Sequence, residues 1–162
     1  MSERDFNGFA RQYAEWIATN KIDIHAASGL NVKRAELHPR LFEYQKDAVL
    51  WALRRGHGLL AESFGLGKTT QQIEILRQVH RATSGVQLVI CPLGVKHQFI
   101  HEDGPAMGVT FRYVRTDAEC ESAIAETPYI ITNYERVRDG DISQDWISAN
   151  VTGVCMDEAA IL

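Results

Sequence analysis

The chain has 162 residues, of which 45% are hydrophobic and 23% are charged. This size and composition predict one globular domain, or part of one, and exclude a wholly disordered chain. The formal net charge of -4 excludes a global basic field that could hold nucleic acid by electrostatics alone, so any such contact must be local.

The first part of the chain is predicted to be helical. Between Phe6 and Thr19, apolar residues recur at intervals of three and four, which predicts an amphipathic helix. Polar and turn-forming residues up to Pro39 follow, so residues 1–38 are expected to form a helical N-terminal extension and connector. Residues 41–56 place apolar side chains on one face and end in basic residues and Gly56, which predicts a second helix with a C-terminal stop.

The rest of the chain alternates short apolar runs with helical segments. The runs that predict strands are 57–63, 86–92, 109–114, 129–134 and 151–159. The segments that predict helices are 69–82, 95–103 and 118–126. Continuously apolar strands between helices indicate a parallel sheet buried on both faces, so the expected fold class is α/β. A ligand is expected where the carboxyl ends of the strands meet the starts of the helices.

The cysteines and the hydropathy pattern indicate the cellular compartment in which the protein is expected. Cys91, Cys120 and Cys155 are an odd number without CxxC spacing, which favours a reduced cytoplasmic protein over a disulfide framework or a zinc site. The first residues lack an apolar core of signal-peptide length, and no run of about 18 apolar residues occurs. We therefore expect a protein that is neither exported nor inserted in a membrane.

The stretch FGLGKTT, residues 64–70, has the pattern of a phosphate-binding loop. Gly65 and Gly67 let the backbone turn its N–H groups towards phosphate oxygens, and the following helix presents its N-terminus to negative charge. Lys68 would reach the terminal phosphates and Thr69 would offer a hydroxyl to magnesium. Glu62 stands where the strict pattern GxxxxGK[ST] has glycine. The alternative is a glycine-rich turn with a solvated lysine.

An acidic pair follows the last apolar run. A nucleoside triphosphate site needs an acid that holds magnesium, usually at the end of another buried strand. Asp157 occupies such a position, and Glu158 beside it could act as a general base towards water. Taken alone, the pair could equally be the polar end of a strand, so its interpretation depends on the loop upstream.

These motifs together resemble those of superfamily 2 helicases. LFEYQ, AESFGLGKTT, VICPLGVKHQF, ITNYERV and VCMDEAA occur in the order and spacing of helicase motifs Q, I, Ia, Ib and II. The likeness covers residues 41–162 and is greatest to the chromatin-remodeller-like branch and its phage helicases. In that family an acidic residue commonly replaces the first glycine of motif I, so Glu62 fits the relaxed form.

The resemblance implies a RecA-like, P-loop parallel sheet in residues 39–162 and a set of functional residues. It implies ATP and Mg2+ as cofactors, with Lys68, Asp157 and Glu158 in catalysis and with Thr69 and Asp157 at the metal. Residues implied to hold the nucleotide are Gln45, at the adenine edge, and Gly65, Leu66, Gly67, Lys68, Thr69 and Thr70. Residues implied to contact the backbone of a nucleic acid are Pro92, Leu93, Gln98, Thr132, Asn133 and Tyr134.

The expected function is that of the N-terminal lobe of a DNA-dependent ATPase that translocates on, or remodels, DNA. DNA is favoured over RNA, and the phage likeness implies the cytoplasm of a bacterium or of a phage-infected cell. Residue 162 follows closely on motif II. The chain is therefore expected to hold an incomplete N-terminal lobe and not to include the second RecA-like lobe of such motors. Ala160, where the family often has histidine, puts the route that couples nucleotide to nucleic acid in doubt.

Other interpretations stay open from sequence. The chain could be a non-catalytic nucleotide-binding half-motor that regulates a larger helicase or nuclease, or another P-loop enzyme such as a small-molecule kinase. His97 and His101, four residues apart with Glu102 beside them, have a spacing that could chelate a metal, but no third ligand is apparent.

Overall fold

The computed structural model describes residues 29–61 and 65–158. The predicted helix at residues 6–19 lies outside this part. The described strands are β1 (Val86–Cys91), β2 (Arg112–Tyr113), β3 (Tyr129–Asn133) and β4 (Val151–Met156). The helices are α2 (Glu43–Arg55), α3 (Lys68–Thr83), α4 (Gly104–Ala106), α5 (Asp117–Ile124), α6 (Tyr134–Arg138) and α7 (Gln144–Asn150). A 3-10 turn, η1 (Arg34–Glu36), and a π-helical segment, η2 (Gln98–Asp103), complete the described elements.

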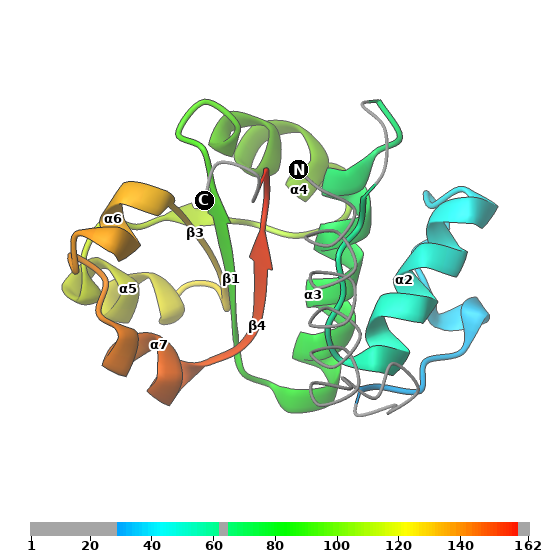
Figure 1. Ribbon diagram of the computed structural model, residues 1–162, viewed down its shortest axis with the longest axis horizontal. Helices are drawn as coiled ribbons and strands as arrows, with labels where there is room; N and C mark the ends of the chain where they lie inside the picture. The colour runs from blue at the N-terminus through cyan, green and yellow to red at the C-terminus, as the bar shows by residue number, and fades with distance from the viewer. Residues whose placement is uncertain (1–28, 62–64, 159–162) are drawn as a thin grey trace, which may run out of the picture.

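The described strands form one parallel sheet in the order β2-β3-β1-β4. Helices α2 and α3 lie on one side of this sheet, and α5, α6 and α7 lie on the other (Figure 1). The expected α/β class with a parallel sheet flanked by helices is thus confirmed. Every connection between neighbouring parallel strands crosses over the sheet, which is why helices cover both faces.

The two faces of the sheet are built from alternate residues of the same strands. Val89, Cys91 and Ile131 face α3 and η2, where they pack with Ile73, Leu76 and Phe99. Their neighbours Leu88, Ile90 and Ile130 face α5 and α7, where they pack with Cys120, Ala123 and Trp146. Because helices cover β1 and β3 on both faces, nearly all of their residues are buried, whereas β4 alternates partly buried and exposed residues.

Helix α2 packs on the outer side of α3. Val49 and Leu53 of α2 meet Leu37 and Leu41 from the preceding segment, with Ile75 and Val79 of α3 packed against them. The described end of the predicted connector is therefore packed against this domain. Helix α2 ends where Gly56 takes a left-handed conformation, with φ 77°, so the predicted helix and its glycine stop are confirmed.

The apolar run 57–63 was predicted to be a strand, and for residues 57–61 that prediction is wrong. These residues have no regular secondary structure, and Leu59 is 76% exposed. A run this short forms a strand only where a sheet edge accepts its backbone hydrogen bonds and its side chains become buried. In the described part of the chain, β4 pairs with β1 alone, and residues 57–61 pair with neither strand.

Two other regions differ from the prediction. The strand expected over 109–114 pairs only at Arg112 and Tyr113, because Val109 and Phe111 pack into the core beside η2 instead of extending the ladder. Helices α6 and α7 were not predicted. Helix α7 begins at a polar cap, where the Ser143 hydroxyl accepts a hydrogen bond from the Trp146 backbone N–H, 3.1 Å away. Among the described helices, none is long and apolar enough to cross a membrane.

Candidate nucleotide-binding site

The loop that precedes α3 has the backbone of a phosphate cradle. Gly65 and Gly67 have positive φ angles of 82° and 72°, and Gly67 is the N-terminal cap of α3, which starts at Lys68. The first backbone N–H groups of an α-helix have no partner within the helix and carry the positive end of its dipole. The loop therefore delivers the chain to a helix terminus that suits an anion, with Lys68 and Thr69 as its first residues.

We expect Gly67→Ala to lower the affinity for ATP and the melting temperature much more than Gly65→Ala does. Both substitutions impose the cost of a left-handed backbone, about 1–2 kcal/mol per residue. A Cβ at position 67 would also lie 2.5 Å from Gln45 Nε2, whereas one at position 65 meets nothing within 4 Å. The measurement is the affinity of each variant for ATP, together with its melting temperature. Equal losses in the two variants would contradict the predicted role of the Gln45 contact.

The backbone carbonyl of Leu66, between the two glycines, receives three side-chain donors. Tyr44 Oη lies 3.1 Å from it, Gln45 Nε2 lies 2.9 Å from it, and Gln71 Nε2 lies 3.4 Å from it. Gln45 also accepts a hydrogen bond at Oε1 from the Phe42 backbone N–H, at 2.9 Å. Both ends of this buried amide are thus engaged within the protein, and its assignment to the adenine edge stays a prediction.

A pocket of about 330 Å³ opens beside this loop. Its lining residues are Arg40, Phe42, Tyr44, Gln45, Gly65, Leu66, Gly67 and Thr70. The Phe42 and Tyr44 rings are stacked, with centroids 6.0 Å apart and planes 10° from parallel, and both side chains are exposed. Flat aromatic surfaces next to a basic side chain suit a nucleobase. Sequence reasoning missed Arg40, Phe42 and Tyr44 as binding residues, although the two aromatic residues lie within the quoted motif LFEYQ.

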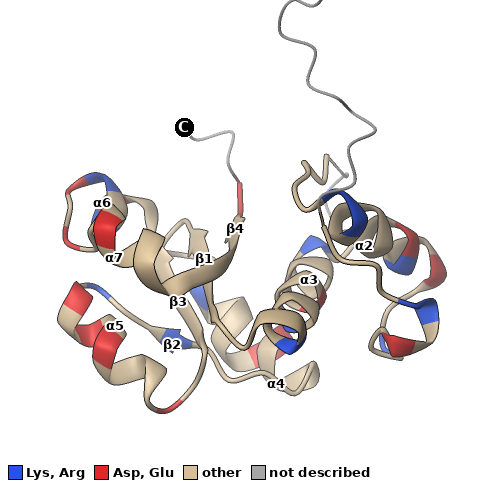
Figure 2. Cartoon of the chain, turned by 90° about the horizontal axis from the view of Figure 1, so that it is seen from below, with Lys and Arg blue, Asp and Glu red and all other residues tan. Residues whose placement is uncertain are grey.

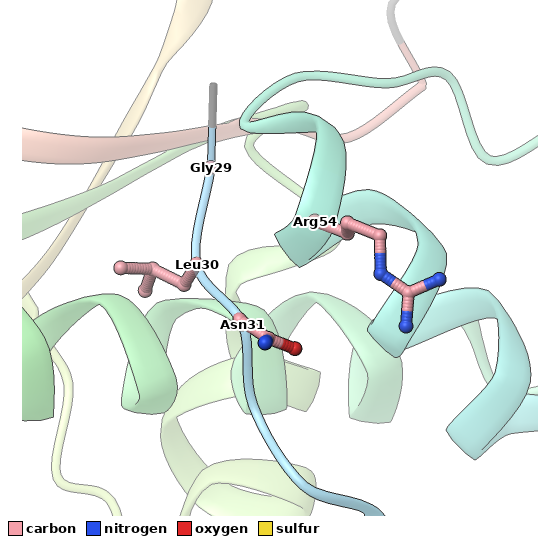
Figure 3. Close-up of a pocket in the computed structure, with 4 residues that line it drawn as sticks. All are labelled: Gly29, Leu30, Asn31 and Arg54. Carbon is pink, nitrogen blue, oxygen red and sulfur yellow. The ribbon is translucent and has the colours of Figure 1, made fainter. Parts of the chain in front are cut away.

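A second cavity, of about 420 Å³, lies apart from the predicted residues. Figure 3 shows Gly29, Leu30 and Asn31 on an extended segment that passes the last turn of α2, from which Arg54 projects. The segment is held by its backbone, because the Gly29 and Leu30 N–H groups donate to the carbonyls of Arg54 and Leu53. None of these four residues was predicted to bind a ligand.

The structure brings Asp157 to the helix that carries Lys68 and Thr69. Asp157 follows β4, is buried, and accepts a hydrogen bond at Oδ1 from Gln72 Nε2 on α3, at 2.9 Å. Its backbone N–H donates to the Ile90 carbonyl at 2.9 Å, which extends the pairing with β1 by one residue. Thr69, which is buried, lies one helical turn before Gln72 and on the same face of α3.

Tyr134 fixes the backbone carbonyl of Asp157. The Tyr134 hydroxyl donates a hydrogen bond to this oxygen at 2.6 Å. Burial raises the pKa of the Tyr134 phenol above its usual 10.0, and the nearby charge of Asp157 adds to the rise. The hydroxyl therefore remains a donor at neutral pH.

Burial also raises the pKa of the Cys91 thiol to about 12, so Cys91 is an uncharged core group and not a thiolate ligand.

The donor atoms at this position fit Mg2+ bound with a nucleotide. Among residues 29–61 and 65–158, no three His, Cys, Asp or Glu side chains gather as a metal site. Mg2+ bound with a nucleotide takes one or two carboxylates together with phosphate oxygens and waters. The Thr69 hydroxyl and the Asp157 carboxylate are oxygen donors of the required kind. Gln72 adds a buried Oε1 atom that has no hydrogen-bond partner within the described part of the chain.

The residues expected to contact nucleic acid differ in their exposure to solvent. Leu93 and Gln98 are exposed and Pro92 is partly exposed, all in the segment after β1, and Gln98 Nε2 donates to Asp103 at 2.8 Å. Thr132, by contrast, is 0% exposed, and its hydroxyl donates to the Val114 carbonyl at 2.8 Å. As folded here, Thr132 offers no surface to a polymer, so its assignment rests on the sequence resemblance alone.

Asn133 and Tyr134 lie where β3 leads into α6. Asn133 Oδ1 accepts from the Tyr113 hydroxyl at 2.7 Å, and Asn133 Nδ2 donates to Glu135. The ammonium group of Lys96, in the segment after β1, lies 4.1 Å from the centre of the Tyr113 ring. This edge of the sheet therefore combines the two predicted segments with Lys96, a partly exposed cation that sequence reasoning did not single out.

The surface charges are mixed. Figure 2 shows acidic residues at the end of β4 and both signs of charge over the helices. Several arginines of the described residues are already paired, such as Arg115 with Glu119 and Arg136 with Asp141, each at 2.7 Å. Such pairing agrees with the inference from net charge that contact with a nucleic acid must be local.

The structure describes Glu158, but neither of the two residues that depart from the motif patterns. Glu158 is exposed and has φ 50°, a left-handed conformation that a residue other than glycine rarely adopts. Its side chain is therefore accessible to solvent beside Asp157. Glu62 and Ala160 lie outside the described residues.

Comparisons with known proteins agree with this geometry. The family model described as "SNF2-related domain" matches residues 44–162. A Caenorhabditis elegans protein named as a homolog of "SWI/SNF-related matrix-associated actin-dependent regulator of chromatin subfamily A-like protein 1" is 44% identical over 73 residues, which are 44% of this chain and 10% of that protein. The "DNA excision repair protein CSB" of Oryza sativa subsp. japonica is 34% identical over 87 residues, which are 49% of this chain and 7% of that protein.

A DNA repair and recombination protein of Saccharomyces cerevisiae is 33% identical over 73 residues, which are 41% of this chain and 7% of the yeast protein. The aligned segments thus cover a tenth or less of the length of these relatives. All three relatives are eukaryotic, so the predicted phage branch and the predicted bacterial or phage-infected cell receive no support from them.

Proposed function

Because the chain belongs to the SNF2-related domain family, we propose that it is the ATP-binding N-terminal lobe of a DNA-dependent ATPase that couples ATP hydrolysis to translocation on, or remodelling of, DNA. The observation that carries the proposal is the hydrogen bond from Gln72 of α3 to Asp157. It joins the helix that begins with the phosphate loop to the acid at the end of β4.

In this proposal each part of the site holds a different part of the nucleotide. The backbone N–H groups at the start of α3 and the ammonium group of Lys68 bind the phosphates. The pocket lined by Arg40, Phe42 and Tyr44 receives the base. Tyr44 and Gln45 both donate to the Leu66 carbonyl, so the wall of the base pocket is tied to the phosphate loop.

The acidic residues act beside the phosphates. The Thr69 hydroxyl and the Asp157 carboxylate would hold Mg2+, which when bound neutralises charge on the phosphate oxygens. Glu158, exposed next to Asp157, is placed to accept a proton from an attacking water as a general base. Lys68 and the α3 terminus stabilise the negative charge that develops on the transferred phosphoryl group.

DNA is the proposed polymer because relatives carry names that refer to chromatin regulation, DNA excision repair and DNA recombination. The segment after β1, with the exposed Leu93 and Gln98, would contact its backbone, and Lys96 would add a cation at the same edge. Contacts of this kind fix the position of a protein on DNA without reading its sequence.

Titration of the 162-residue chain with a fluorescent ATP analogue and Mg2+ tests the proposal. We expect saturable binding that unlabelled ATP competes away, with a dissociation constant of about 1 μM to 1 mM, the span of enzyme KM values. We also expect binding to duplex DNA that weakens as salt rises, because phosphate contacts release counterions. Absence of saturable nucleotide binding in this range would contradict the proposal. DNA binding without nucleotide binding would leave a DNA-binding module in its place.

A further inference from the structure

Gln72 is the side chain of α3 that reaches Asp157. The two residues lie 85 positions apart, both are buried, and Gln72 Nε2 is 2.9 Å from Asp157 Oδ1. None of the motifs quoted for the helicase resemblance gives Gln72 a role. It lies one turn after Thr69, on the face of the helix that turns towards the end of β4.

The chemistry of the two groups fixes the orientation of the amide. The carboxylate of Asp157 can only accept hydrogen bonds when ionised, so the nitrogen end of the Gln72 amide must face it. The terminal torsion of an aspartate side chain is broad, and a donor on one oxygen restricts it. Gln72 therefore holds one oxygen of Asp157 and leaves the other oxygen to a different partner.

The oxygen end of the same amide is unused. Gln72 is 8% exposed, and its Oε1 atom is enclosed without a hydrogen-bond partner in the described part of the chain. Buried polar atoms in folded proteins are nearly always satisfied, so this acceptor beside a carboxylate is available to a donor from outside the described residues. A water molecule bound to a divalent cation is such a donor.

We propose that Gln72 is a positioning residue for Mg2+ at this site. Its N–H group orients Asp157 towards the metal, and its Oε1 atom accepts a hydrogen bond from a metal-bound water. This inference rests on the proposed ATP-binding function. Outer partners that orient metal ligands typically change metal affinity by about 10–100-fold when they are removed. If Gln72 only satisfied a buried carboxylate, its loss would affect folding without any selectivity for Mg2+.

The test compares ATP binding in excess Mg2+ with ATP binding in EDTA. Gln72→Met keeps the unbranched shape and removes both polar atoms. We expect this variant to bind ATP about tenfold more weakly than wild type in Mg2+ and equally well in EDTA. The matched control is Gln78→Met, another buried glutamine of α3, whose amide donates to the Glu36 carbonyl and to Glu74. The control should keep the Mg2+ preference of wild type.

The possible results separate this inference from the proposed function. An unchanged Mg2+ preference in Gln72→Met, or equal losses in Mg2+ and EDTA, would overturn the positioning role while ATP binding by wild type stands. Absence of ATP binding by wild type would overturn both. Circular dichroism checks the fold of each variant. If Gln72→Met fails to fold, Gln72→Ala provides the same comparison, with the same expected result and the same overturning results.

Discussion

Lys68→Ala is expected to abolish measurable ATP binding by the intact chain. Lys68 is the first residue of α3 and follows the glycine that caps the helix. A hydrogen bond to a charged group contributes about 1.5–3 kcal/mol, and each 1.4 kcal/mol changes affinity tenfold. Loss of the ammonium group, which in the proposal contacts more than one phosphate oxygen, should therefore weaken binding by at least about 100-fold.

The measurement is a fluorescence or calorimetric titration with ATP and Mg2+, using Lys33→Ala as the control. Lys33 is an exposed lysine ahead of η1, on the segment that leads into α2. The control should bind ATP like wild type, and both variants should keep the far-ultraviolet circular dichroism spectrum of wild type. An affinity of Lys68→Ala equal to that of wild type would count decisively against the phosphate-loop assignment.

Phe99→Ala should have the largest effect on stability, lowering the free energy of unfolding by about 3–5 kcal/mol. Phe99 lies on η2 and is 0% exposed, and its ring meets the Phe111 ring edge-on with centroids 5.7 Å apart. It fills the space between the sheet and the segment that follows β1. Truncation leaves a cavity between elements that cannot close around it without moving the backbone.

Urea denaturation of the 162-residue chain measures this loss. The control is Leu93→Ala, on the same segment after β1 but 52% exposed, which should change the free energy of unfolding by no more than about 0.5 kcal/mol. A change of less than about 1 kcal/mol in Phe99→Ala would show that η2 is not packed on the sheet as described.

The fold was predictable where apolar patterns were long. Residues 69–82 have a helical period over several turns, and the strands β1 and β3 are largely apolar, so both kinds of element were placed within a residue or two. Short segments depended on tertiary contacts that no local pattern reveals. Residues 57–61 are mostly apolar but pair with no strand in the part of the chain that the structure describes, and α7 is short and defined by the Ser143 cap.

The candidate site was predictable where residues follow one another in a motif. Gly65 to Gly67 lead into a helix that starts with Lys68 and Thr69, and Asp157 follows a strand, so their types and positions predicted a shared site. Gln72 and Tyr44 could not be found in this way, because their contacts with Asp157 and Leu66 are made across 85 and 22 residues. Period-two alternation would place Thr132 on the same face of β3 as Ile130, but it cannot show that this face stays covered at the strand end.

Helix α3 belongs at once to the candidate site and to two of the core clusters. Its first turn carries Lys68 and Thr69, Ile73 and Leu76 pack against the sheet, and Ile75 and Val79 pack against α2. Thermodynamic linkage then makes the melting temperature a readout of occupancy, since a ligand at 100 times its dissociation constant adds about 2.7 kcal/mol to stability. The converse also holds: a core substitution that loosens α3 lowers the population of chains that can bind, so affinity can fall without any change at the site itself.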